Sequence, residues 1–381
     1  MLKARPINLA ETNIAGLGTD LEKKLRLHAG DTESAWTGAG TAPGIKVWRI
    51  EKFEVKDWPK SDYGKFFSGD SYIVLNTFKK PDGDKLYHDI HFWLGLETSQ
   101  DEAGTAAYKT VELDDHLGTV PIQHREIQSS ESPLFLSYFK QYSVQSGGID
   151  SGFNHTSPET YRPRLLHIRS VAIPAVKNGR KPSTTLTVRE VPLSHKSLNS
   201  GDVFVFDGGL ELIQWNGSKA SGSEKVKAAE FVRKVDDDRK GLAKVVVVEE
   251  SDDSTAFWNA IGGKGPIASP EEGDAQTHAK ADKVLFRLAH RLSDNTGELK
   301  FTEEARGKVL KSQLDSKDVF VFDSGLEVFV WVGSESAPEE RKRAMQYALE
   351  YVKQHNRPLD IPVTRVVEGA VSATFDASFD A

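Results

Sequence analysis

Three aspartate and glutamate pairs recur in the sequence at matching distances from a Trp-x-Gly motif. In each copy a glutamate follows the tryptophan by nine residues, and an aspartate opens the apolar segment that precedes the tryptophan. In chain order the members are Asp70, Trp93 and Glu102; Asp202, Trp215 and Glu224; and Asp318, Trp331 and Glu340. Two carboxylates that are brought together repel one another unless a cation joins them, and hard oxygen ligands suit Ca²⁺ better than zinc. The pattern therefore favours a repeated calcium site.

A structural interpretation of the same glutamates competes with this one. Two of them follow a serine, Ser99 or Ser221, by three residues, which is the capping-box spacing at the start of a helix. In the third copy the spacing from Ser336 selects Glu339, whereas the spacing from the tryptophan selects Glu340. The glutamate therefore keeps its distance from the tryptophan of the sheet but not from the capping serine. This favours a role as a metal ligand over a role in the helix cap.

The elements that would position these pairs also repeat. LNSGDVFVFDGGLELIQWNGS, from Leu198, and LDSKDVFVFDSGLEVFVWVGS, from Leu314, are nearly the same string, and FFSGDSYIVLNTFKKPDGDKLYHDIHFWLG, from Phe66, is a looser copy. Each string predicts two strands joined by a turn, followed by a helix with one apolar stripe. The fold class is therefore α/β (α+β): three tandem modules, each a mixed central β-sheet flanked by a long and a short helix.

Stretches rich in Gly and Pro divide the chain. We predict an N-terminal arm with a short helix at residues 1–44, a first module at 45–146, a linker at 147–160, a second module at 161–261, a linker at 262–280 and a third module at 281–381. The helix in the arm is predicted from a capping box at 19–22.

Composition and charge exclude several classes of protein. The net charge is −7, from 49 basic and 56 acidic residues, and no stretch concentrates the basic ones, so nucleic acid is not an expected partner. The chain has no cysteine, no secretory signal and no apolar run long enough to cross a bilayer. We therefore expect a cytoplasmic protein that is not transmembrane.

The sequence resembles the gelsolin superfamily, specifically its three-domain severin and fragmin type. The most specific passage, HFWLGLETSQDEAGTAAYKTVELDDHLGTVPIQHREIQ from His91, is similar to the first gelsolin domain, and the Asp, Trp and Glu frame is similar to that of the second and third. The resemblance implies a non-enzymatic protein of the cytoplasm and cytoskeleton, monomeric when free, that binds monomeric and filamentous actin. It implies severing and barbed-end capping of filaments, or also nucleation, under calcium control.

The resemblance also implies particular calcium ligands. They are Asp70, Glu102 and the carbonyls of Gly69 and Ile149 in module 1; Asp202, Glu224, Asp274 and the Gly201 carbonyl in module 2; and Asp318, Glu340 and the Lys317 carbonyl in module 3. The resemblance further implies a calcium ion that is shared with actin, for which Asp114 is the matching carboxylate. Glu126 and Glu131 are the candidates for a second carboxylate at this site.

The first-domain helix of the family enters a cleft of actin, and here that helix is Ser99 to Leu113. The resemblance makes Ala103, Ala107, Tyr108 and Val111 candidate actin contacts, whereas the residues alone would assign this face to the core. The implied mechanism is that this helix wedges into the actin cleft, module 2 binds the filament side, and calcium opens a latch between modules.

Lipid binding is the point at which the sequence departs from its relatives. The lysine-rich segment that binds phosphoinositides in related proteins reads KQYSVQSGG here and holds only Lys140, while Arg162, Arg164 and Arg169 form a second, weaker basic cluster. Phosphoinositide binding is therefore only weakly supported.

Two other functions stay open at this stage. Capping or nucleation without severing would need the first module but not the side-binding surface of the second. An enzyme would use each pair as a general acid and base, but three copies without a nucleophile or a substrate cleft count against it.

Overall fold

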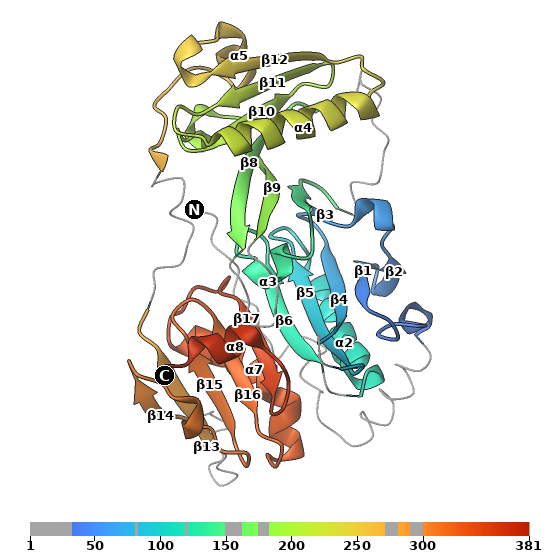
Figure 1. The fold of residues 1–381 in the computed structure, drawn as a ribbon, viewed down its shortest axis with the longest axis vertical. Helices are drawn as coiled ribbons and strands as arrows, with labels where there is room; N and C mark the ends of the chain where they lie inside the picture. The colour runs from blue at the N-terminus through green and yellow to red at the C-terminus, as the bar shows by residue number, and fades with distance from the viewer. Residues whose placement is uncertain are drawn as a thin grey trace.

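The computed structural model describes residues 33–80, 83–118, 121–148, 162–173, 183–270, 281–289 and 300–380. Within them the chain forms three modules, with module 2 at one end of the molecule and modules 1 and 3 side by side at the other (Figure 1). The helix predicted in the N-terminal arm lies outside the described residues. No helix in the described ranges is long and apolar enough to cross a membrane.

The modules share one core order of elements, to which module 1 adds β3 and β7. Module 1 contains β1 (Gly44–Glu51), β2 (Glu54–Asp57), β3 (Lys65–Phe67), β4 (Ser71–Lys79), β5 (Leu86–Leu94), α2 (Gln100–His116), β6 (Ile122–Ile127), α3 (Pro133–Leu136) and β7 (Gln141–Gln145). Module 2 contains β8 (Arg164–Ile173), β9 (Ser183–Val191), β10 (Val203–Asp207), β11 (Glu211–Asn216), α4 (Gly222–Asp238), β12 (Lys244–Glu249) and α5 (Thr255–Ala260). Module 3 contains β13 (Val284–Ala289), β14 (Lys300–Arg306), β15 (Val319–Asp323), β16 (Val328–Val332), α7 (Pro338–Gln354), β17 (Val363–Val367) and α8 (Ala373–Ser378).

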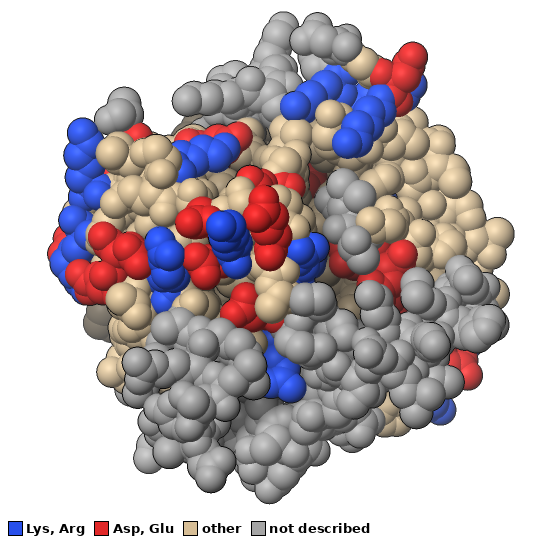
Figure 2. Space-filling view, turned by 90° about the horizontal axis from the view of Figure 1, so that it is seen from below, with Lys and Arg blue, Asp and Glu red and all other residues tan. Residues whose placement is uncertain are grey.

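The predicted fold class is confirmed, because each module has a mixed sheet, one long helix (α2, α4, α7) and one short helix (α3, α5, α8). The predicted turns form where glycine allows a positive φ, 88° at Gly209 and 91° at Gly325. The long helices bury the predicted apolar stripes, including Ala228 and Val232 in α4 and Ala348 in α7. Among the described residues on the face seen from below, basic and acidic side chains are interspersed and form no large patch of one sign (Figure 2).

The sheets of neighbouring modules are continuous, which the sequence analysis did not predict. One sheet has ten strands in the order β14-β13-β15-β16-β17-β6-β5-β4-β1-β2, and the other has seven in the order β12-β11-β10-β8-β9-β7-β3. The first joins modules 1 and 3 through antiparallel pairing of β6 with β17, which sets Thr364 opposite His124. The second joins modules 1 and 2 through β7 and β9. An edge strand offers unpaired backbone groups to any partner, so its own sequence does not name that partner.

Strand β12 holds the place in module 2 that β6 and β17 hold in modules 1 and 3. It forms an outer edge of the seven-stranded sheet, and no strand among the described residues pairs with its free side. Val245 and Val247 remain 44% and 55% exposed there. We therefore expect the free edge of β12 to be a site of unwanted association.

A Val247→Lys variant tests this expectation. The free energy of unfolding should change by no more than about 0.5 kcal/mol, because the replaced side chain is already half exposed. Aggregation on heating should decrease, because an edge lysine opposes further strand pairing. Light scattering during a thermal ramp, with Val248→Lys as a buried and destabilising comparison, checks both results.

Candidate metal sites and the junction of modules 1 and 3

The first aspartate of the repeated frame lies in the interior of module 1, just before β4. Asp70 is fully buried, and its Oδ2 lies 2.7 Å from the guanidinium of Arg49 on β1. Tyr72 donates a hydrogen bond of 3.1 Å to the same oxygen. The negative charge of Asp70 is therefore already compensated inside the protein.

Backbone and a second carboxylate also approach this aspartate. The N–H of Gly69 donates to the carbonyl of Gly147 at 2.7 Å, and a Cβ at Gly148 would lie 2.7 Å from Asp70 Oδ1. Burial, together with the charge of Asp70, raises the pKa of Glu102 in the first turn of α2. Two carboxylates that repel one another, with backbone packed closely over them, are a donor set that fits a hard cation such as Ca²⁺.

The second pair lies at the same place in module 2. His167 Nε2 and Asn199 Nδ2 lie 2.8 Å and 2.9 Å from Asp202 Oδ2. Burial opposes ionisation of Asp202, but the hydrogen bond and charge of His167 outweigh it and lower its pKa. Glu224 accepts hydrogen bonds from the N–H and hydroxyl of Ser221, and from a backbone N–H of β8 at 3.0 Å. The acids of this module are therefore both held by protein donors.

The third pair is the most exposed. Asp318 Oδ2 lies 3.0 Å from Arg287 on β13, and the side chain of Asp318 is 30% exposed. Glu340 is buried and accepts the backbone N–H of Ala337 at 3.3 Å. The donor types suit a hard cation here as well, although the structure shows each carboxylate engaged with a protein group.

One step of the sequence analysis was wrong. It took Ser336 as the cap of the third long helix, which would place Glu339 in the capping register. The helix instead begins at Pro338 with Ala337 as its N-cap, so Glu340 is the third helical residue, as the corresponding glutamates are in α2 and α4. The helix start moves with the glutamate, so the spacing does not separate a capping role from a ligand role.

The residues predicted to supply carbonyl ligands lie in matching turns of modules 2 and 3. The N–H of Gly201 donates to the side chain of Asn199 at 2.8 Å, and the N–H of Lys317 donates to the side chain of Asp315 at 3.1 Å. Two predicted ligands, Ile149 and Asp274, lie outside the described residues. For all of these positions calcium ligation stays a prediction.

The aspartate predicted to share calcium with actin is covered by module 3. Asp114, near the end of α2, is 3% exposed, and Arg365 on β17 lies 3.7 Å from its Oδ2. Burial raises the pKa of Asp114 to about 6, against the opposing charge of Arg365. Two further contacts hold the junction: Arg125 donates to the carbonyl of Leu359 at 3.0 Å, and Ser130 donates to Asp360 at 2.7 Å.

The predicted actin-contact face of α2 is partly exposed in this arrangement. Ala103, Ala107, Tyr108 and Val111 are each neither buried nor fully exposed. Met345 of α7 packs against the core of module 3 and also against the core of module 1, against which Ala107 of α2 packs as well. A side chain of module 3 therefore contributes to the core of module 1.

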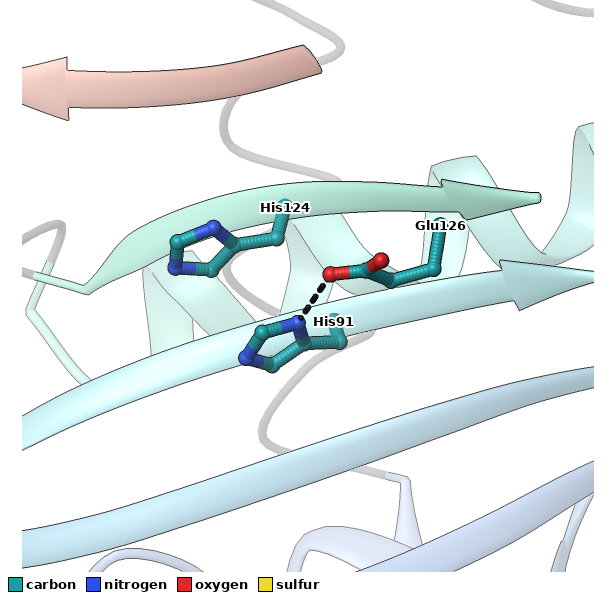
Figure 3. Close-up of side chains that lie close together, drawn as sticks. All are labelled: His91, His124 and Glu126. Carbon is teal, nitrogen blue, oxygen red and sulfur yellow. Dashed lines mark hydrogen bonds and ion pairs between the residues drawn. The ribbon is translucent and has the colours of Figure 1, made fainter. Parts of the chain in front are cut away.

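A buried histidine cluster occupies the sheet beside this junction (Figure 3). The rings of His91 and His124 stack with centroids 4.2 Å apart, and His91 Nδ1 lies 2.8 Å from Glu126 Oε1. Their ligand-type atoms lie within 4.8 Å of one another. However, His91 Nε2 is hydrogen-bonded to Tyr138 and His124 Nδ1 to Thr364 of module 3. These contacts make the cluster a polar interior that connects modules 1 and 3.

The two candidates for a second carboxylate beside Asp114 are held elsewhere. Glu126 belongs to the histidine cluster, and burial raises its pKa to about 7. Glu131 lies 2.7 Å from Arg189 and accepts a hydrogen bond of 2.5 Å from Tyr142. Within the described ranges no hydrogen bond or ion pair joins either carboxylate to Asp114.

Comparison with known proteins decides the family. The gelsolin-repeat family model matches residues 52–136, 184–258 and 300–375. The chain is 39% identical to Gelsolin-like protein 2 of Lumbricus terrestris over 383 residues, which cover 100% of this chain and 99% of that protein. It is 33% identical to Severin of Echinococcus granulosus, over 97% of this chain and 96% of that protein. The chain belongs to the gelsolin family.

This gelsolin-family chain has the three-domain organisation of the severin type. It is also 39% identical to cytoplasmic gelsolin of Homarus americanus, over 91% of this chain but 45% of that longer protein. The three matched repeats fall on the three modules, each of which carries one copy of the Asp, Trp and Glu frame.

The basic residues considered for lipid binding are partly engaged within the protein. They are Lys140, Arg162, Arg164 and Arg169. Arg162 pairs with Glu190 at 2.6 Å and Arg164 with Asp207 at 3.1 Å. The charge of Arg169 acts on the carboxylate of module 2 that belongs to the repeated frame. Phosphoinositide binding stays a weakly supported prediction.

Sequence reasoning missed four basic residues that the structure places at these carboxylates: Arg49, His167, Arg287 and Arg365. The first three precede their aspartates by 21, 35 and 31 residues, so no constant spacing reveals them. The fourth reaches its carboxylate from another module. Only the strand register could have found them.

The junction between modules 1 and 3 should weaken as the pH rises from 5.5 to 8. Burial raises the pKa of Glu327, which is hydrogen-bonded to Thr364, from 4.5 to about 7. Between pH 4.5 and pH 7, Glu327 keeps its proton in the folded junction but releases it in the unfolded chain. The stability of the folded junction therefore falls as the pH rises. The midpoint of thermal unfolding should fall by on the order of 4 °C over this range.

A Glu327→Gln variant should show a flatter dependence of the unfolding midpoint on pH, because its side chain does not titrate. Exposed Glu335→Gln is the matched control and should keep the wild-type slope. An unchanged slope in Glu327→Gln would exclude this carboxyl as the source of the pH dependence.

Proposed function

We propose that this chain severs actin filaments and caps their barbed ends in a calcium-dependent manner, and that the structure is its closed arrangement. The observation that carries the proposal is the burial of Asp114 beside Arg365 of module 3, together with the packing of Met345 of α7 against the core of module 1. Membership in the gelsolin family and relatives named gelsolin and severin support the actin target. The proposed protein is a cytoplasmic, cytoskeletal, non-enzymatic one that is monomeric when free.

Calcium would be held by the three repeated frames. In module 1 the donors would be Asp70, Glu102 and the carbonyls of Gly69 and Ile149. In the other modules they would be Asp202, Glu224, Asp274 and the Gly201 carbonyl, and Asp318, Glu340 and the Lys317 carbonyl. A bound Ca²⁺ would supply the positive charge that lets paired carboxylates lie together.

The residues of the junction define what must change for α2 to meet actin. Strand β17 has to leave β6, and Arg365 has to leave Asp114, before this helix can enter a cleft on another protein. The small side chains of Ala103 and Ala107 would then allow close approach, with Tyr108 and Val111 as contacts. Binding of a cation can drive this opening only if the open arrangement binds it more tightly than the closed one.

Module 2 would bind the side of the filament and bring module 1 to the site of severing. Its outer elements α4 and β12 lie at the end of the molecule away from the junction (Figure 1). Severing therefore needs two separate surfaces, whereas capping alone needs only module 1.

The test is a filament-shortening assay under the microscope with stabilised, preformed actin filaments. Filaments should shorten at saturating calcium and keep their length in a calcium chelator. An Asp202→Asn variant should need more calcium for half-maximal shortening. Unchanged filament length at saturating calcium would refute severing, and slowed barbed-end growth in the same experiment would then leave capping as the function.

A further inference from the structure

The three missed basic residues beside the calcium-ligand aspartates occupy equivalent positions. Arg49 on β1 lies opposite Tyr72, His167 on β8 opposite Phe204, and Arg287 on β13 opposite Phe320. In each module the residue opposite is the second one after the aspartate of the frame. Side chains two apart in a strand share one face of the sheet, so the basic residue reaches the aspartate diagonally.

Each basic side chain contacts one oxygen of its aspartate. The distances to Oδ2 are 2.7 Å for Arg49 and Asp70, 2.8 Å for His167 and Asp202, and 3.0 Å for Arg287 and Asp318. The same kind of contact, from the same register, therefore occurs in all three copies although the side chains differ.

Aromatic rings hold the basic side chains in place. Arg49 lies 5.5 Å from the ring centroid of Trp58, and Arg287 lies 5.2 Å from that of Phe320. The ring of His167 stacks on Phe204 with centroids 4.8 Å apart and planes 11° from parallel. The two guanidinium cations are stabilised by the ring quadrupoles and the His167 ring is held by stacking, so these side chains are oriented toward the aspartates before any ion arrives.

We propose that Arg49, His167 and Arg287 are internal partners that compete with calcium for the aspartates and set the calcium affinity of each module separately, the two arginines as counter-ions and His167 through its hydrogen bond. The inference rests on the proposed function, because it takes these aspartates as calcium ligands. A carboxylate oxygen that binds Ca²⁺ must give up its contact with the basic side chain, and a remaining positive charge at this distance repels the ion. Removal of the counter-ion therefore tightens calcium binding.

The environments of the pairs imply a graded effect. The side chains of Arg49 and Asp70 are 3% and 0% exposed, whereas those of Arg287 and Asp318 are 36% and 30% exposed. Arg287 is also shared with Glu304 at 2.9 Å. Charges interact more strongly when water is excluded, so Arg49 of module 1 opposes calcium more strongly than Arg287 of module 3 does.

Isothermal titration calorimetry with calcium on the full chain tests the inference. Arg287→Met should bind calcium in module 3 about two- to fivefold more tightly than wild type, which is the range for a partly exposed ion pair. Its matched control is Arg306→Met on the neighbouring strand β14, where the arginine pairs with Glu303 instead. This control should leave every calcium affinity unchanged.

Arg49→Met provides the second measurement. Without calcium it should unfold at a lower temperature than wild type, because Asp70 loses its buried partner. With saturating calcium the deficit should shrink or disappear, because the ion takes over the charge compensation. A deficit of the same size with and without calcium would mean that Arg49 only stabilises the fold, and would overturn the inference for module 1.

The outcomes separate this inference from the proposed function. Wild-type protein that shows no calcium binding by calorimetry would refute both. Wild-type protein that binds calcium, with Arg287→Met and Arg306→Met both at wild-type affinity, would overturn the counter-ion inference and leave calcium regulation standing.

Discussion

An Arg365→Glu variant is expected to separate module 3 from module 1 without added calcium. The substitution places a carboxylate next to the buried carboxyl of Asp114. Burial already raises the pKa of Asp114 to about 6. Two buried carboxylates with no cation between them cost several kcal/mol, which is on the order of the whole stability of a domain. Strand β17 keeps its pairing with β16, so module 3 should stay folded after it separates.

Small-angle X-ray scattering should then show a larger radius of gyration for Arg365→Glu in a calcium chelator. Under the proposed function this variant should also shorten actin filaments with less calcium than wild type. Arg343→Glu, which changes an exposed arginine of α7 by the same charge, is the control and should scatter like wild type. A compact Arg365→Glu protein would show that this ion pair does not hold the junction closed.

An Asp207→Asn variant is expected to lower the free energy of unfolding of module 2 by about 3–5 kcal/mol. Asp207 ends β10, is fully buried, and binds Arg239 through both oxygens at 2.8 Å and 2.9 Å. It also pairs with Arg164 at 3.1 Å. The asparagine would remove the negative charge that both partly buried guanidinium groups contact, and denaturant unfolding measures the loss.

The control for this variant lies in the same module. Asp253 pairs with Lys264 at 2.7 Å, but both side chains are more than 60% exposed, so Asp253→Asn should destabilise the module far less than Asp207→Asn does. A loss of similar size in both variants would contradict the argument from burial. Module 3 repeats the arrangement with Asp323 and Arg357, so Asp323→Asn should behave like Asp207→Asn.

Much of the local structure was predictable from the residues. The apolar segments of the repeated strings became strands, the glycines after Asp207 and Asp323 became turns, and the apolar stripes at Ala228 and Ala348 became buried helix faces. These features depend on neighbours in the chain, where periodicity and turn chemistry act directly. The start of α7 at Pro338 escaped the same reasoning, because helix caps depend on details of one or two residues.

In the candidate sites, too, the acidic residues were predictable from the sequence and their basic partners were not. The frame of aspartate, tryptophan and glutamate is a matter of types and spacing, and it identified three modules and the carboxylates that could meet a cation. The partners of those carboxylates could not be read in this way. Arg49, His167 and Arg287 reach their aspartates through strand register, and the loops between them differ in length, so the separation along the chain carries no signal.

The sequence alone therefore determined the repeated module, its elements and the positions of its acidic residues, because these follow from local patterns. Only the tertiary structure decided which edge strands pair, that β17 joins β6, and that Arg365 covers Asp114. The physical reason is that the backbone groups of an edge strand are the same in every sequence. Their partner is chosen by the packing of whole modules against one another.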